Sequence, residues 1–139
     1  MKKTFLLLSF CSLFFFGCLS SQELSAFQKI DYKAQTRGSS FQITLQKGTL
    51  TYIENNKEVF QRALSKKESK AIYKSLKGID LNTIDKITPP SKNHQSDRSL
   101  IASLEVESEG TIYKSSSFDD DNPPKELKEL VDYLKSLTQ

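Results

Sequence analysis

Few residues in this chain are suited to catalysis, and the single histidine, His94, is the first to consider. A catalytic histidine needs an orienting carboxylate and a nucleophile within reach. Asp97 is close in the sequence, but no nearby serine carries a pattern that marks an activated nucleophile. We therefore predict that His94 is a solvated loop residue and that the protein is not an enzyme. A hydrolase whose site has no recognisable motif is the alternative.

The acidic run Asp119, Asp120 and Asp121 is the candidate metal site. Carboxylate oxygens suit calcium, but the run lacks the alternate spacing and the distant glutamate of an EF-hand loop. The same residues are typical of a helix N-terminus, where acids meet the positive end of the helix dipole. Asn122 then serves as the N-cap and Pro123 as the first helical residue. We favour this second interpretation and predict no metal and no cofactor.

The two cysteines, Cys11 and Cys18, both lie near the start of the chain. Lys2 and Lys3 precede an apolar run over residues 5–16 that is short for a membrane-spanning helix. A positive start followed by a short apolar core is the layout of a secretory signal peptide. The rest of the chain therefore has neither a disulfide nor a cysteine ligand for a metal.

The sequence FFGC at the end of the apolar run, residues 15–18, resembles the lipobox of bacterial lipoproteins. The resemblance implies cleavage between Gly17 and Cys18 and a diacylglyceryl group on the Cys18 thiol, which anchors the protein in a membrane. In this family an aspartate after the cysteine holds a protein at the inner membrane. Leu19 stands there, which implies the outer membrane and leaves its face open. The alternative is an ordinary secretory signal cut within residues 19–22.

Length and charge predict one compact domain behind this anchor. Residues 1–17 form the predicted signal peptide, 18–26 the lipidated cysteine with a flexible spacer, and 27–139 the domain. Removing residues 1–17 from the 139 leaves 122, which is enough for one core. Without Lys2 and Lys3 the formal net charge falls from +3 to +1, which argues against a nucleic-acid-binding protein.

Alternating apolar residues and turn signals predict four antiparallel strands after residue 26. Two-residue turns are expected at Gly38-Ser39, Lys47-Gly48 and Asn55-Asn56. These turns pair Tyr32 with Leu45, Ala34 with Ile43, Leu45 with Leu50, Ile43 with Tyr52, Tyr52 with Val59, and Glu54 with Lys57. All three registers place one apolar set on a single face: Ile30, Tyr32, Ala34, Ile43, Leu45, Leu50, Tyr52 and Val59. A one-residue slip would scatter this set between both faces.

A capping box predicts the first helix. Ser65 and Glu68 have the spacing of that motif, and a modest apolar stripe follows over residues 66–77. The lysines of this helix are expected to form a solvated face rather than to contact lipid headgroups: Lys66, Lys67, Lys70, Lys74 and Lys77. Residues 80–87 have the spacing of a turn or a short 3₁₀ segment.

A second hairpin and a second helix complete the predicted domain. The Glu109-Gly110 turn opposes Val106 with Tyr113 and Glu105 with Lys114. An apolar stripe over residues 127–137 predicts the final helix. The element order β-β-β-β-α-β-β-α predicts an α+β fold, an antiparallel sheet of about six strands with two helices on its apolar face.

The predicted function is that of a non-enzymatic, lipid-anchored envelope protein that binds another macromolecule, with no nucleic acid and no small-molecule substrate. Arg37 and Gly38, at an exposed hairpin tip, are the candidate partner contact, and strand addition at residues 27–36 or 113–118 is a further mode. An Arg-Gly turn after the first strand and the order of the elements are also similar to emfourin-type inhibitors of secreted metalloproteases. This resemblance implies protease inhibition as the alternative.

Overall fold

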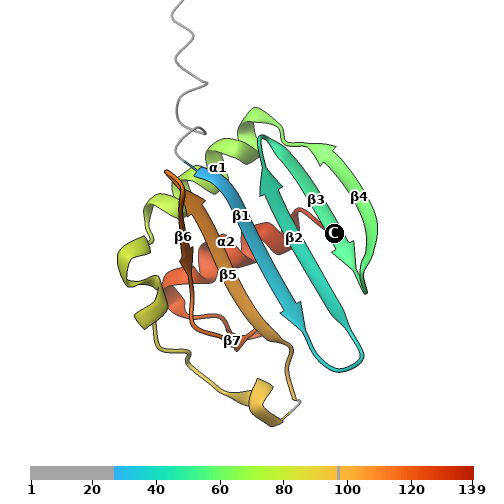
Figure 1. Cartoon of the computed structure of the whole chain (residues 1–139), viewed down its shortest axis with the longest axis vertical. Helices are drawn as coiled ribbons and strands as arrows, with labels where there is room; N and C mark the ends of the chain where they lie inside the picture. The colour runs from blue at the N-terminus through green and yellow to red at the C-terminus, as the bar shows by residue number, and fades with distance from the viewer. Residues whose placement is uncertain (1–26, 97) are drawn as a thin grey trace, which may run out of the picture.

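Seven β-strands form one antiparallel sheet, and two α-helices cover one of its faces (Figure 1). The computed structural model describes residues 27–96 and 98–139; the predicted signal peptide, Gly17, Cys18, the spacer and Asp97 lie outside the described residues. The strands are β1 Phe27–Gln35, β2 Ser40–Gln46, β3 Thr49–Glu54, β4 Lys57–Ala63, β5 Ile101–Ser108, β6 Thr111–Lys114 and β7 Phe118–Asp119. The helices are α1 Lys66–Lys77 and α2 Lys125–Ser136, with 3₁₀ segments η1 Leu81–Lys86 and η2 Asn93–Ser96. The predicted α+β class is confirmed.

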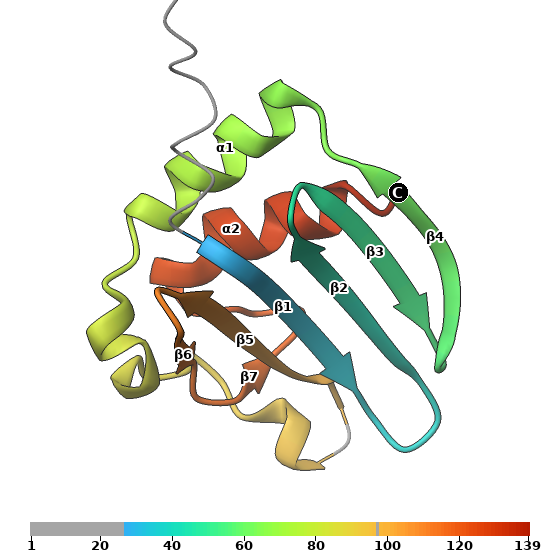
Figure 2. The same ribbon diagram turned by 45° about the horizontal axis from the view of Figure 1, so that its top comes forward.

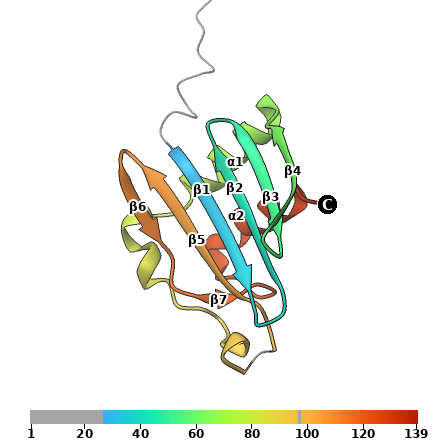
Figure 3. The ribbon, with the colours of Figure 1, turned by 45° about the vertical axis from the view of Figure 1, so that its right-hand side comes forward.

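The strand order across the sheet is β4-β3-β2-β1-β5-β6, and β7 pairs with the start of β5 (Figure 3). β1 to β4 form the predicted meander. The prediction that residues 27–36 form an exposed edge is wrong, because β5 pairs along β1 and aligns Ile30 with Val106 and Tyr32 with Leu104. The edges of the main path are β4 and β6, so only the β6 part of residues 113–118 lies at an edge.

The turn between β1 and β2 lies one residue earlier than predicted. It is centred on Arg37 and Gly38, and the Thr36 N–H donates to the Ser39 carbonyl over 2.8 Å. Ala34 therefore pairs with Phe41 rather than with Ile43, while Tyr32 and Ile30 take Ile43 and Leu45. The register is shifted by two, and an even shift keeps every side chain on its predicted face.

A β-bulge interrupts the pairing of β3 with β4. The predicted pairs Leu45–Leu50 and Glu54–Lys57 are present. Beyond them the register shifts between Tyr52 and Ile53, so that Tyr52 pairs with Phe60 and not with Val59. Val59 is consequently 54% exposed, and the prediction that it belongs to the apolar face is wrong. A bulge adds one unpaired residue to a strand, which reverses the facing of residues beyond it.

The first helix and the β5–β6 hairpin form as predicted. Ser65 Oγ accepts the Glu68 N–H, and the Glu68 carboxylate accepts the Ser65 N–H over 2.7 Å, which completes the capping box of α1. In the hairpin, Glu105 faces Lys114 and the two side chains form an ion pair of 2.8 Å. These features depend on residues close together in sequence.

The second helix starts later than predicted. Its N-cap is Pro124, with no side-chain cap, and Asn122 Nδ2 instead donates to Ser91 Oγ over 2.8 Å. Both helices cover the same face of the sheet (Figure 2), and the buried apolar residues of helices and strands form one core. Its buried apolar residues are Ile30, Tyr32, Ala34, Ile43, Leu45, Leu50, Ile72, Leu76, Ile79, Ile84, Ala102, Leu104, Val106, Phe118, Leu127, Leu130, Val131 and Leu134.

Candidate functional site

The central strand β1 separates two ends of the domain with different chemistry. The chain enters β1 at Phe27, beside the Lys47-Gly48 turn, and we name this the Phe27 end. The Arg37-Gly38 turn lies at the other end of the strand, and we name this the Arg37 end (Figure 2). β1 has 9 residues. At ~3.3 Å per residue, the two ends are about 30 Å apart.

The Arg37 end carries the predicted partner contact. Arg37 and Gly38 are exposed at the tip of the β1–β2 hairpin. The neighbouring Asn55-Asn56 turn is fixed to the start of β2, because the Asn55 N–H donates to the Ser40 carbonyl and the Ser40 N–H donates to Asn55 Oδ1. The hairpin tip therefore protrudes beside a turn that is hydrogen-bonded in place.

His94 also lies toward this end, and the prediction of a solvated loop residue is wrong. Its side chain is 8% exposed, and its Nδ1 lies against the carboxylate of Asp119, which is fully buried. Asp119 also accepts the backbone N–H groups of Asn93, at 2.8 Å, and His94, at 2.7 Å, together with the Ser91 hydroxyl. We call Ser91, Asn93, His94 and Asp119 the Asp119 cluster.

The Asp119 cluster has the residue types of a hydrolase triad in a different order. In a triad the histidine lies between the serine and the carboxylate and removes the serine proton. Here the Ser91 hydroxyl and His94 Nδ1 both contact the Asp119 carboxylate, so the acid occupies the centre. Burial raises the pKa of Asp119, but the hydrogen bonds from Ser91, His94 and Asn93 outweigh it and hold that pKa well below its usual range. The geometry suits a charged acceptor that fixes η2 against β7.

The remaining acids of the run have separate partners. Asp120 accepts the Tyr32 hydroxyl over 2.6 Å and pairs with Lys135 over 2.9 Å. Asp121 accepts the Ser99 hydroxyl over 2.6 Å. Burial and this bond to Asp120 raise the pKa of Tyr32 far above its usual value. Among the described residues no group of three or more His, Cys, Asp or Glu side chains could hold a metal ion.

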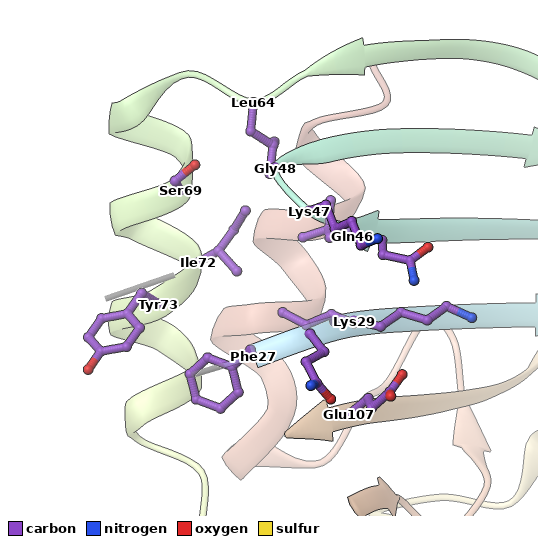
Figure 4. A pocket seen from close by; sticks show the side chains of 13 residues that line it. Phe27, Lys29, Gln46, Lys47, Gly48, Leu64, Ser69, Ile72, Tyr73 and Glu107 are labelled. Atoms are coloured by element: carbon purple, nitrogen blue, oxygen red, sulfur yellow. The ribbon is translucent and has the colours of Figure 1, made fainter. Parts of the chain in front are cut away.

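The Phe27 end contains a groove that the sequence did not reveal. It has a volume of about 620 Å³ and opens between α1 and the ends of β1 and β2. Its apolar lining consists of Phe27, Ile30, Leu45, Leu64, Ile72 and Tyr73. Figure 4 shows Ser69 and Ile72 on the side of α1 that faces the Lys47-Gly48 turn. The rings of Phe27 and Tyr73, which both line the groove, meet at 6.0 Å between centroids.

The sequence contains one indirect signal of this groove, although it does not show where the groove lies. Phe27 and Tyr73 are large aromatic residues outside the apolar sets assigned to the core, and both are only half-buried.

Comparison with known proteins found no matching family model, no matching curated sequence and no matching solved structure. In the part of the chain that the structure describes, no helix is long and apolar enough to cross a membrane.

Proposed function

We propose that this protein is a non-enzymatic, lipid-anchored envelope protein that binds another macromolecule through its Arg37 end. The observation that supports this most is the direction of β1. Because β1 runs from Phe27 to the Arg37-Gly38 turn, the chain enters the domain from the predicted anchor segment at the end of β1 opposite the hairpin tip. A protein attached to the outer membrane at one end presents the other end to its surroundings.

The local structure of the Arg37 end is suited to recognition. Exposed arginine is frequent among the residues that dominate protein interfaces. The neighbouring turn is fixed by the Ser40–Asn55 hydrogen bonds, and the Asp119 cluster fixes η2 toward the same end of the domain. A preorganised surface loses little conformational entropy when a partner binds.

The anchor is tested by the Cys18→Ala variant, expressed with its signal in a bacterium that acylates lipoproteins. We expect the wild-type protein to stay with the membranes after an alkaline carbonate wash and the variant to be released. Mass spectrometry of the wild-type N-terminus should find an acylated Cys18. An unacylated N-terminus downstream of Cys18 contradicts the anchor.

The partner contact is tested by photo-crosslinking in the native envelope. A photoreactive residue at Ser39 should give a discrete adduct with a macromolecule, whereas the same residue at Lys86, in η1, serves as the matched control. Arg37→Ala should weaken the Ser39 adduct roughly tenfold, as expected for an interface arginine. Equal adducts from both positions, or none from Ser39, contradict recognition at the Arg37 end.

The same tip supports inhibition of a secreted protease as a second candidate, because exposed Arg37 lies on a protruding hairpin that a protease cleft could receive. A panel of secreted metalloproteases and serine proteases tests it with the purified protein at micromolar concentration. Inhibition that is lost in Arg37→Ala favours this candidate. No inhibition across the panel leaves binding without inhibition as the function.

A further inference from the structure

The groove at the Phe27 end has the size and lining of a ligand site. Ligand pockets commonly have volumes of about 300–1,000 Å³ and predominantly apolar walls. The groove, at about 620 Å³, falls within this range, and six of its lining residues are apolar or aromatic. Its polar lining includes Ser69, Lys29 and Lys47, with Glu107 as the one acid among the residues that line it in the described chain. Such a groove suits an apolar chain with an anionic group at its end.

Helical geometry places three lysines of α1 next to the residues that line this groove. Ser69 and Tyr73 line it, and at 3.6 residues per turn Lys66, Lys70 and Lys77 fall on the adjacent flank of the helix. The position of Lys77 confirms this arrangement, because its Nζ lies 5.2 Å from the centre of the Tyr73 ring. Lys47 lies across the groove, in the turn between β2 and β3. Lys47 therefore lines the groove itself, and the α1 lysines lie on the flank of the helix beside Tyr73.

We propose that the groove binds one acyl chain of an anionic phospholipid, with the headgroup between Lys47 and the flanking lysines of α1. The acyl chain lies against Phe27, Ile72 and Leu64, and the lysines neutralise the phosphate. Charge complementarity selects this occupant over a zwitterionic lipid, since each lysine near an anionic surface contributes about a fivefold preference. This inference rests on the proposed function for access to lipid, because the predicted anchor segment immediately precedes Phe27 in the chain.

The test uses the full chain reconstituted into vesicles of phosphatidylglycerol and phosphatidylcholine. One lipid at a time carries a photoreactive diazirine on its acyl chain, and labelled peptides are identified by mass spectrometry. We expect labelling within Lys66–Lys77 or near Phe27, at least fivefold stronger from phosphatidylglycerol, and weaker at high salt. Labelling confined to residues 1–26, or equal labelling from both lipids, overturns the proposal.

A matched pair of variants separates the groove from the helix surface. Ser69→Phe places a ring in the groove from α1 without removing a core side chain, and should reduce labelling at least fivefold. Lys67→Phe adds the same ring on the other flank of α1 and should leave labelling unchanged. Competition by soluble lysophosphatidylglycerols needs no variant, and potency should rise roughly fourfold for each added methylene. Equal labelling of the two variants, or competition independent of chain length, overturns the proposal.

The headgroup contact is tested by charge removal. The triple variant Lys66→Gln, Lys70→Gln and Lys77→Gln should lose most of the preference for phosphatidylglycerol, by roughly tenfold or more. The control triple Lys57→Gln, Lys92→Gln and Lys125→Gln changes the net charge equally and should keep it. Equal losses in both triples overturn the assignment of the lysines. Cys18→Ala in the same vesicles should keep the groove labelling, so failure of the anchor and failure of the groove are distinguishable.

Discussion

The two ends of the domain, at either end of β1, are packed in different ways. At the Arg37 end a buried carboxylate, Asp119, accepts hydrogen bonds from Ser91, Asn93 and His94. At the Phe27 end apolar side chains from α1 and the sheet meet only in part and leave a groove. Hydrogen bonds require specific partners at short distance, whereas apolar burial has no directional requirement. The comparison teaches that a polar network fixes one end of the domain, whereas incomplete apolar packing leaves a groove at the other.

The charged side chains at the two ends also differ in their surroundings. The acids of the Arg37 end are occupied, because Asp120 pairs with Lys135 and the carboxylate of Asp119 is surrounded by donors. The lysines beside the groove are exposed along α1. A field that is not locally neutralised attracts ligands of opposite charge. We therefore expect salt to weaken ligand binding at the Phe27 end. The stability of the Arg37 end should depend instead on its hydrogen bonds.

The largest effect on stability is expected from Asp119→Ala. The substitution leaves the N–H groups of Asn93 and His94 and the Ser91 hydroxyl without their acceptor, and a network of this kind contributes about 3 kcal/mol to the free energy of unfolding. Urea denaturation measures the loss. Hydrogen exchange should accelerate at Asn93 and His94, while lipid labelling of the groove should be unchanged if the two ends act separately.

Asp121→Ala is the control for that experiment. Asp121 belongs to the same acidic run but is exposed, and it accepts a hydrogen bond from the Ser99 hydroxyl. We expect a change within about 0.5 kcal/mol. A loss of similar size in both variants would mean that general charge in the run, and not the Asp119 cluster, stabilises this end.

Acidification should weaken both ends, through one carboxylate in each. Hydrogen bonds from Arg62 and Ser65 lower the pKa of Glu68 from 4.5 to about 2, and the pKa of Asp119 is also lowered. A carboxylate with a lowered folded-state pKa stabilises fully above its unfolded value and loses that contribution as the pH falls through the folded value. Urea midpoints should therefore decrease from about pH 5 towards pH 2.

Two variants separate the contributions of Asp119 and Glu68 to this pH dependence. Asp119→Asn should flatten the curve equally at low and high salt, because the group is buried. Glu68→Gln should flatten it mainly at low salt, since Arg62 is 38% exposed and its ion pair is screened. A curve that neither variant changes would place the acid sensitivity elsewhere in the domain.

Much of the fold follows from residues that are close in sequence. The Ser65–Glu68 capping box, the Lys47-Gly48 turn and the Glu105–Lys114 pair were all predictable, because each depends on a few neighbouring residues. The face of each residue in β1 and β2 was also predictable, although the turn was displaced. Alternation with a period of two fixes the face even when the register is shifted by two.

The site was less predictable, because its contacts join distant segments. Asp119 and His94 are 25 positions apart. The sequence of the polar loop does not show which carboxylate its histidine will contact. The bulge that exposes Val59 has no local turn signal either. The groove depends on where α1 crosses the sheet, which is set by packing of the whole core rather than by any motif.

The smallest effect concerns the glycines of the two turns. Gly48, at the Phe27 end, has φ +75, where an added Cβ is strained although no atom lies within 4 Å of it. Gly38, at the Arg37 end, has equal space but no positive φ. We expect Gly48→Ala to cost about 1 kcal/mol by urea denaturation and Gly38→Ala to be neutral or stabilising by about 0.5 kcal/mol. If Gly38→Ala also weakens the Ser39 crosslink while stability is unchanged, the glycine is needed for close approach of the partner; a cost of 1 kcal/mol or more for Gly38→Ala would instead contradict the geometry of that turn.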